Sequence, residues 1–160
     1  VIEYARNCAG LKDANSEEFE EKPKGSRDHL IYHLSKWIKD QKVEIRDKVQ
    51  NKGGTMRLGA YPARINKGTM AFSIYKSELV SERHRHRFEV NIKFQKALEK
   101  SGLTFSGFSE DGTLPEIVEL STHPFFLGVQ FHPELKSKPF EPHPIFSIFV
   151  KKALEQTRLV

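Results

Sequence analysis

The apolar segment Phe125–Phe131, which stops at His132-Pro133-Glu134, constrains the fold more than any other part of the chain. It is too short for a buried helix and is apolar on both faces, a pattern typical of a central strand. Strands and helices alternate along the rest of the chain, so the sequence predicts an α/β fold. In an open α/β sheet, ligand sites lie beyond the carboxyl ends of the strands, and this strand would deliver His132 and Glu134 to that edge.

Turn and capping residues divide the rest of the chain into short elements. Val1, Tyr4, Ala5 and Cys8 recur at helical spacing before Gly10, which predicts a helix with these residues on its buried face. Asp111-Gly112 between two extended runs is a strong hairpin signal. The other expected elements are strands at 29–34, 57–65 (broken near Pro62) and 82–90, helices at 91–101 and from Pro144 onwards, a loop at 16–27, a charged stretch at 36–52, a mobile turn at Gly53-Gly54 and an exposed turn at 75–79.

Composition matters mainly for the classes of protein that it excludes. With 38% hydrophobic and 29% charged residues, the 160-residue chain is typical of one soluble globular domain. No apolar run reaches the roughly 18 residues of a membrane-spanning helix, and the first residues lack the features of a signal peptide, so we expect a cytoplasmic protein. The single cysteine, Cys8, rules out an internal disulfide and a cysteine-rich zinc site. The net charge of +5 favours a solvated basic surface over a nucleic-acid site.

His132 and Glu134 are the first candidates for chemistry. Imidazole takes up a proton near neutral pH, and a carboxylate two residues away can hold its tautomer and stabilise the imidazolium. A nucleophile would be the third member of such a site. Taken alone, however, the His-Pro-Glu triplet also fits an ordinary hydrogen-bonded turn histidine.

The segment 82–89 alternates basic and other side chains. As a continuous strand it would place Arg83, Arg85 and Arg87 on one face, and it would place His84, His86 and Phe88 on the other. An arginine at such a position can grip a carboxylate through two parallel hydrogen bonds. An exposed charged strand is an equally open interpretation. A His-x-His metal pair without a local third ligand and a basic RNA-binding strand with few aromatic residues are the weaker ones.

Cys8 is the residue that chemistry would first suggest as a nucleophile. Its spacing from Val1, Tyr4 and Ala5 predicts that its thiol packs in the helix as a small hydrophobic group. A nucleophilic cysteine is expected at an exposed turn or at the start of a helix, where the pKa of its thiol is lowered. We therefore expect Cys8 to have no catalytic role.

Four segments together resemble one known family. They read NSEEF at 15–19, GGTMRLG at 53–59, ERHRHRFEVN at 82–91 and GVQFHPE at 128–134. In order and spacing they are similar to the C-terminal part of the class I, triad-type glutamine amidotransferase domain of the CTP synthase family, and the resemblance runs from Val1 to about Leu154. The second and third segments taken together are highly specific to that family, whereas the fourth is shared by triad glutamine amidotransferases in general.

The resemblance implies that residues 1–160 form the C-terminal half of an open mixed-sheet, flavodoxin-like, three-layer glutaminase domain. It further implies an enzyme that makes CTP from UTP with ATP and Mg²⁺, takes ammonia from glutamine, is activated by GTP and forms a homotetramer. By position in the motifs, His132 matches the base of the catalytic triad and Glu134 its partner, and the residues Glu18 and Arg87 match those that hold glutamine. The loop 46–57 matches a mobile lid associated with GTP. No residue of the chain is assigned to ATP, Mg²⁺ or another metal or cofactor.

The resemblance also implies parts that this chain does not contain. In the family the nucleophilic cysteine lies in a Gly-x-Cys-x-Gly-x-Gln turn before the position of Val1, and a synthetase domain binds ATP and UTP. We therefore expect an upstream glutaminase segment and a synthetase domain as partners, and we expect the chain alone to be inactive. The alternatives are a non-catalytic remnant that serves as a binding or regulatory module, and another class I glutamine amidotransferase or a γ-glutamyl hydrolase.

Overall fold

The chain folds around a five-stranded antiparallel sheet. A computed structural model describes residues 1–19, 29–33, 36–39, 42–45 and 56–157. The strands lie in the order β5-β4-β7-β8-β9, and each neighbouring pair is antiparallel. Their bounds are β4 Arg57–Ile65, β5 Leu79–His86, β7 Thr104–Ser109, β8 Pro115–Glu119 and β9 Leu127–Val129.

Among the described residues, four more strands form two small antiparallel sheets. β1 (Ile31–His33) pairs with β6 (Phe88–Val90), and β2 (Lys36–Lys39) pairs with β3 (Lys42–Ile45). β1 confirms the strand predicted at 29–34. The pairing of β2 with β3 was not predicted, because charged residues dominate this stretch of the sequence and hide the pattern of the short strands.

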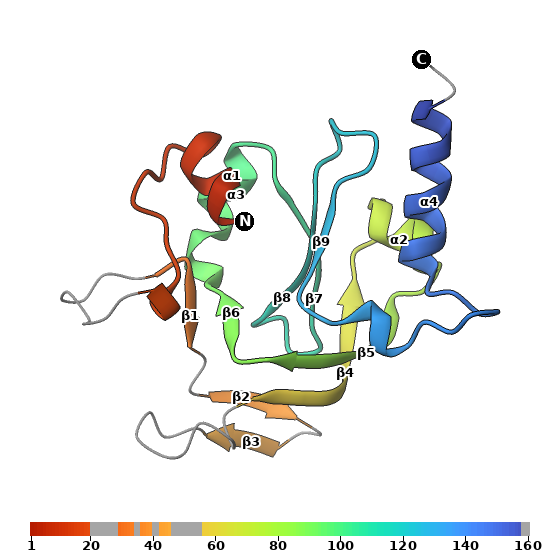
Figure 1. Ribbon diagram of the computed structural model, residues 1–160. Helices are drawn as coiled ribbons and strands as arrows, with labels where there is room; N and C mark the ends of the chain where they lie inside the picture. Colours follow the sequence, from red (N-terminus) through yellow and green to blue (C-terminus); the bar gives the residue numbers. More distant parts are fainter. Residues whose placement is uncertain (20–28, 34–35, 40–41, 46–55, 158–160) are drawn as a thin grey trace.

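Helices lie on both sides of the five-stranded sheet, so the predicted α/β class is confirmed (Figure 1). α1 and α3 pack in the hydrophobic cluster on one side, and α2 and α4 pack in the cluster on the other. None of the helices in the described residues is long and apolar enough to cross a bilayer. The bounds are α1 Ile2–Asn7, α2 Met70–Tyr75, α3 Gln95–Lys100 and α4 Pro144–Thr157, with 3-10 turns η1 Glu17–Phe19, η2 Ile92–Phe94 and η3 Pro133–Leu135.

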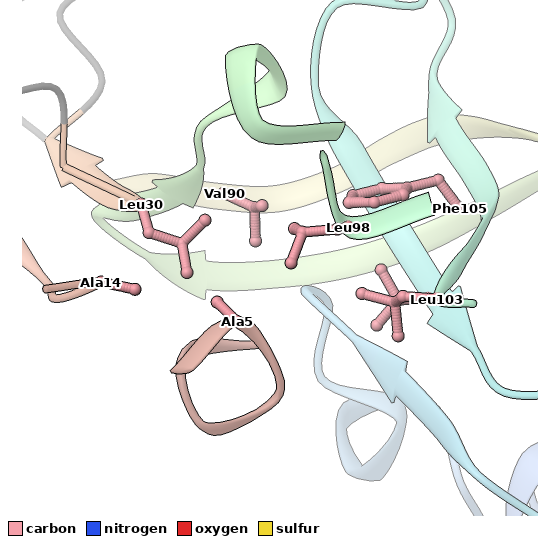
Figure 2. Packing of buried hydrophobic residues seen from close by; sticks show 8 residues of the cluster. Ala5, Ala14, Leu30, Val90, Leu98, Leu103 and Phe105 are labelled. Atoms are coloured by element: carbon pink, nitrogen blue, oxygen red, sulfur yellow. The ribbon is translucent and has the colours of Figure 1, made fainter. Parts of the chain in front are cut away.

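β8 is buried on both faces, and its consecutive residues reach both hydrophobic clusters. Val118 packs in the first cluster with Ala5 of α1 and Leu98 of α3, whose side chains converge in Figure 2. Ile117 packs in the second cluster with Ile145 of α4. Successive side chains of a strand point to opposite faces, so β8 joins the two cores. Burying each large apolar side chain contributes about 1.5–3 kcal/mol to folding.

The strand predicted at 125–131 is shorter than expected and lies elsewhere in the sheet. β9 spans only Leu127–Val129 and, within the described residues, pairs with β8 alone, so the prediction of a central strand is wrong. A run of apolar residues indicates that helices or loops cover both faces of a strand. Its place in the sheet depends instead on backbone pairing, which the side-chain pattern does not encode.

Pro62 does not break β4, although the sequence predicted a break there. It lies opposite Ser81 of β5, and pairing with β7 begins only at Ala63. The N–H of Ile65 donates to Glu78 O on the β5 side, so by alternation position 62 faces the other side, beyond the residues that β7 pairs. No ladder hydrogen bond is lost there, which is where proline is tolerated in a strand.

The hairpin predicted around Asp111-Gly112 is confirmed between β7 and β8. The Asp111 carboxylate accepts hydrogen bonds from Ser109 Oγ at 2.5 Å and from Thr113 N–H at 3.2 Å. Gly112 has a φ of 74°, a left-handed conformation that glycine adopts without steric cost. The hydrogen bonds and the glycine together define the turn locally, which is why the sequence alone predicted it.

Candidate active site

His132 and Glu134 lie in direct contact at the start of η3. His132 Nδ1 is 2.7 Å from Glu134 Oε1, and 37% and 57% of the two side chains are exposed. His132 is the N-cap of η3, and Pro133 occupies the first turn, a position that proline favours. The tight turn brings together two side chains that are separated by one residue. The contact expected from the sequence is therefore present.

The hydrogen bond determines what His132 can do. A carboxylate only accepts, so Nδ1–H of His132 donates, and in this tautomer the lone pair that can accept a proton is on Nε2. The pKa of Glu134 lies below its ordinary value, because its carboxylate accepts hydrogen bonds from its own backbone N–H and from His132. The pair is therefore an imidazole base beside an ionised carboxylate. Such a pair can take a proton from a nucleophile and return it to a leaving group.

Two strands of the main sheet hold the backbone that leads to the pair. Gln130 N–H donates to Glu116 O of β8 at 2.9 Å, and His132 N–H donates to Arg83 O of β5 at 2.8 Å. Phe131 lies between them, is 3% exposed and packs in the second hydrophobic cluster. The backbone of the candidate base is thus anchored on a buried segment, while its side chain reaches solvent.

Arg87 lies in a bend between β5 and β6 and not within one continuous strand. The single strand predicted at 82–90 is wrong in this respect, because β5 pairs with β4 and β6 pairs with β1 in a separate sheet. Arg83 and Arg85 are exposed on β5, whereas Arg87 is partly buried. Alternation of faces holds only within a continuous strand, so it no longer assigns Arg87 to the face of the other two arginines.

Glu18 is an exposed residue of η1. Its neighbour Glu17 ties η1 to β1, since Glu17 Oε2 accepts a hydrogen bond from His33 N–H at 2.7 Å. β1 pairs with β6, which begins directly after Arg87. The two residues that the resemblance connects with glutamine therefore come from neighbouring parts of the structure, although they are far apart in the sequence.

Cys8 is exposed, which contradicts its predicted place on the buried face of the first helix. α1 ends at Asn7, and Cys8 is its C-cap, with its N–H donating to Tyr4 O. Helical spacing no longer defines a face where the chain leaves the helix, so only Ala5 within α1 is fully buried. Cys8 still lies at neither a helix start nor a strand-end turn, the settings expected of a nucleophilic cysteine.

A cluster of buried charged side chains joins β4, β5, β6 and β8, and sequence reasoning missed it. Arg57 Nη2 lies 2.6 Å from Glu116 Oε1, and Arg57 Nη1 lies 3.5 Å from Glu89 Oε1. His84 Nε2 is 3.6 Å from Glu116 Oε2, and His84 Nδ1 is 2.8 Å from Nε2 of His86. The signal available in the sequence was a glutamate inside an apolar strand, because a buried charge needs a partner.

The position of Arg57 also corrects the predicted loop at 46–57. Residues 46–55, with the turn predicted at Gly53-Gly54, lie outside the described residues. Arg57 is described: it is the first residue of β4, it is 2% exposed, and it contacts two carboxylates. Its assignment to a mobile lid is therefore wrong.

Burial dominates the electrostatics of this charged cluster. Desolvation raises the pKa of Glu116 to about 7, against the opposite effect of Arg57. Desolvation also lowers the pKa of His84 to about 2, with further lowering by the charges of Arg57 and His86. His86 Nδ1 donates to Phe88 O at 3.1 Å, so its Nε2 accepts from His84 Nδ1–H. The Nε2 of His84 then carries no proton, and it lies 3.6 Å from Glu116 Oε2, which is beyond hydrogen-bond distance.

The His-x-His pair is thus engaged in hydrogen bonds between its own rings and with the backbone. In the part of the chain that the structure describes, no group of three or more His, Cys, Asp or Glu side chains could hold a metal ion.

Comparisons with known proteins agree on one family. The model of the class-I glutamine amidotransferase family matches residues 8–152. A CTP synthase of Cereibacter sphaeroides is 55% identical over 161 aligned residues, which cover 100% of this chain and 29% of the relative. A CTP synthase of Zymomonas mobilis is 57% identical over 99% of this chain and 28% of its own length. The chain therefore spans less than a third of the curated relatives that it matches.

A solved structure shows the same fold. The glutaminase domain of the Trypanosoma brucei CTP synthase, with bound acivicin, superposes with a TM-score of 0.78 and is 38% identical. The match covers 97% of this chain and 56% of that domain's chain. The arrangement of strands and helices described above is therefore that of part of a glutaminase domain.

Proposed function

The chain belongs to the class-I glutamine amidotransferase family, and from this premise we propose that it supplies the base and its orienting carboxylate for glutamine hydrolysis in a CTP synthase. The observation that carries the proposal is the contact of 2.7 Å between His132 Nδ1 and Glu134 Oε1. Nε2 of His132 would deprotonate a cysteine nucleophile and then protonate the departing ammonia. Glu134 would hold the tautomer and stabilise the imidazolium.

Arg87 and Glu18 would bind the substrate. A guanidinium grips a carboxylate through two parallel hydrogen bonds, so Arg87 suits the α-carboxylate of glutamine. Glu18, exposed on η1, suits the α-ammonium group. Glu17 ties η1, which carries Glu18, to β1, and β1 pairs with β6, which begins directly after Arg87. This proximity supports a shared site.

The remaining parts of the reaction would lie outside these 160 residues. We propose that the nucleophilic cysteine comes from a further glutaminase segment, since Cys8 is at the C-terminal end of α1. A synthetase domain would bind UTP, ATP and Mg²⁺, GTP would activate the reaction, and the whole enzyme would be a cytoplasmic homotetramer. No residue of this chain is assigned to UTP, ATP or Mg²⁺.

The test is to separate the use of glutamine from the use of ammonia in the complete enzyme. His132→Ala should abolish glutamine-dependent CTP formation and spare the ammonia-dependent reaction, because His132 acts only in releasing ammonia. Glu134→Gln should lower glutamine hydrolysis less severely, since orienting the base is secondary to being the base. Equal loss of both reactions in His132→Ala would remove His132 from this role, and an unchanged Glu134→Gln would remove Glu134.

A further inference from the structure

Alternate carbonyls of β5 hold the segment that carries the candidate pair. Within the described residues β5 pairs only with β4, so its other side is open (Figure 1). The carbonyls of Ser81 and Arg83 point to the same side, because strand carbonyls alternate. Arg83 O accepts from His132 N–H at 2.8 Å, and Ser81 O accepts from Lys136 Nζ at 2.5 Å. The ammonium group of Lys136 thus takes the place of a second backbone donor along the open side of β5.

Glu82, the residue between Ser81 and Arg83, strengthens the attachment of Lys136 to β5. Glu82 is 1% exposed, and its Oε1 accepts hydrogen bonds from His143 Nε2 at 2.9 Å and from Tyr75 OH at 3.0 Å. Its Oε2 has no hydrogen bond among the described residues and lies 3.7 Å from Lys136 Nζ. A buried carboxylate oxygen is costly without compensation, so the charge of Lys136 stabilises it.

The turn from His132 to Lys136 is short and is closed by backbone hydrogen bonds. Lys136 is the C-cap of η3, with its N–H donating to Pro133 O at 3.1 Å, and Leu135 N–H donates to His132 O at the same distance. Only three residues separate His132 from Lys136, and proline restricts the first of them. Attaching Lys136 Nζ to Ser81 O therefore fixes the far end of the turn that carries Glu134. His132 N–H fixes the near end.

We propose that Lys136 is a positioning residue, which sets the orientation of the His132–Glu134 pair by clamping η3 to the open side of β5. The proposal rests on the proposed function of the pair in glutamine hydrolysis. Lys136 acts through η3 and needs no contact with the substrate. With the clamp released, η3 can shift, and a shift of about 1 Å at a reacting group typically costs up to a hundredfold in rate.

Lys138 provides a matched control on the same loop. It carries the same charge two residues later, but it is 71% exposed and its Nζ contacts only the nearby Glu141 among its described ion-pair partners, at 3.0 Å. In the complete enzyme, Lys136→Met should lower kcat with glutamine about ten- to hundredfold while KM and the ammonia-dependent reaction stay nearly unchanged. Lys136→Arg should recover most of the loss, because a guanidinium can donate to Ser81 O and neutralise Glu82. Lys138→Met should behave as the unaltered enzyme.

Amide hydrogen exchange reports on the clamp without relying on the reaction. Exchange at His132, Leu135 and Lys136 should become faster in Lys136→Met and should not change in Lys138→Met. Unchanged exchange in Lys136→Met, or faster exchange with unaltered glutamine kinetics, would overturn the positioning role. An equal loss of ammonia-dependent activity would also overturn it, since it would indicate general unfolding. If His132→Ala kept full glutamine-dependent activity, the proposed function itself would fail, and that outcome is separate from any result with Lys136.

Discussion

At the scale of single residues, the bend before β6 places Arg87 in a different environment from the other two arginines of the segment 82–89. Arg83 and Arg85 stay exposed on β5, while Arg87 is partly buried where the chain passes from one sheet to another. Three arginines that look equivalent in the sequence are therefore in two environments. A substrate carboxylate can be held specifically only by a guanidinium whose position is restrained, which favours Arg87 over the two exposed arginines.

We predict that Arg87→Ala raises KM for glutamine about ten- to hundredfold in the complete enzyme and spares the ammonia-dependent reaction. The estimate corresponds to about 1.5–3 kcal/mol for a hydrogen bond to a charged group. The control is Arg85→Ala, which removes an equal charge from the exposed face of β5. Steady-state kinetics with glutamine and with ammonia measure KM and activity for both variants. A similar loss in the two variants would mean that general positive charge, and not a specific grip, is what matters.

At the scale of elements, four strands meet at the buried charged cluster. Burial shifts the pKa values of two of its members, His84 and Glu116, in opposite directions. His84 has a folded-state pKa of about 2 against an ordinary 6.5, so its contribution to stability is complete above 6.5 and is lost as the pH falls towards 2. Glu116 has a folded-state pKa of about 7 against an ordinary 4.5. Its contribution is complete below 4.5 and is lost as the pH rises towards 7.

The opposing effects predict how the free energy of unfolding depends on pH. Between about pH 4.5 and 6.5 the two slopes, each about 1.4 kcal/mol per pH unit for one proton, oppose each other. His84→Asn should leave the Glu116 slope, so stability falls as the pH rises through this window. Glu116→Gln should leave the His84 slope, so stability rises. Urea unfolding at a series of pH values measures the free energy of unfolding of each variant. If this free energy changed with pH in the same direction in both variants, the prediction would be contradicted.

At the scale of the whole molecule, one side of the five-stranded sheet ends on a strand that has no second neighbour among the described residues. In the part of the chain that the structure describes, β9 pairs with β8 only. Beside it lies a pocket whose lining includes Val1, Val118, Phe126 and Val129. Phe126 is 37% exposed. Open strand edges next to apolar surface promote association between chains.

We predict that the 160-residue chain, purified alone, hydrolyses no glutamine and associates with itself. The unaltered chain and a Cys8→Ser variant should both be inactive. Cys8 is at the end of α1, and the 160 residues contain no other cysteine that His132 could deprotonate. Glutaminase assays and sedimentation measure the two properties, and Phe126→Lys should reduce association by placing a charge beside β9. Activity that disappears on Cys8→Ser would make Cys8 the nucleophile, and a monomeric chain would contradict the role of the β9 edge.

The features that the sequence determined by itself are those set by neighbouring residues. The Asp111-Gly112 hairpin depends on a local carboxylate and a left-handed glycine, and the contact of His132 with Glu134 depends on one rigid proline between them. The family resemblance also came from local motifs and agrees with the comparisons. The alternation of strands and helices was sufficient to predict the α/β class.

Only the tertiary structure decided the features that depend on distant parts of the chain. The edge position of β9 follows from which backbones pair, and the exposure of Cys8 follows from where the chain leaves α1. The buried contact of Arg57 with Glu116 joins two strands, and the hydrogen bond from Lys136 to Ser81 joins residues 55 positions apart. No periodicity in the sequence encodes these contacts, because they arise when separate elements pack and bring their polar groups out of water together.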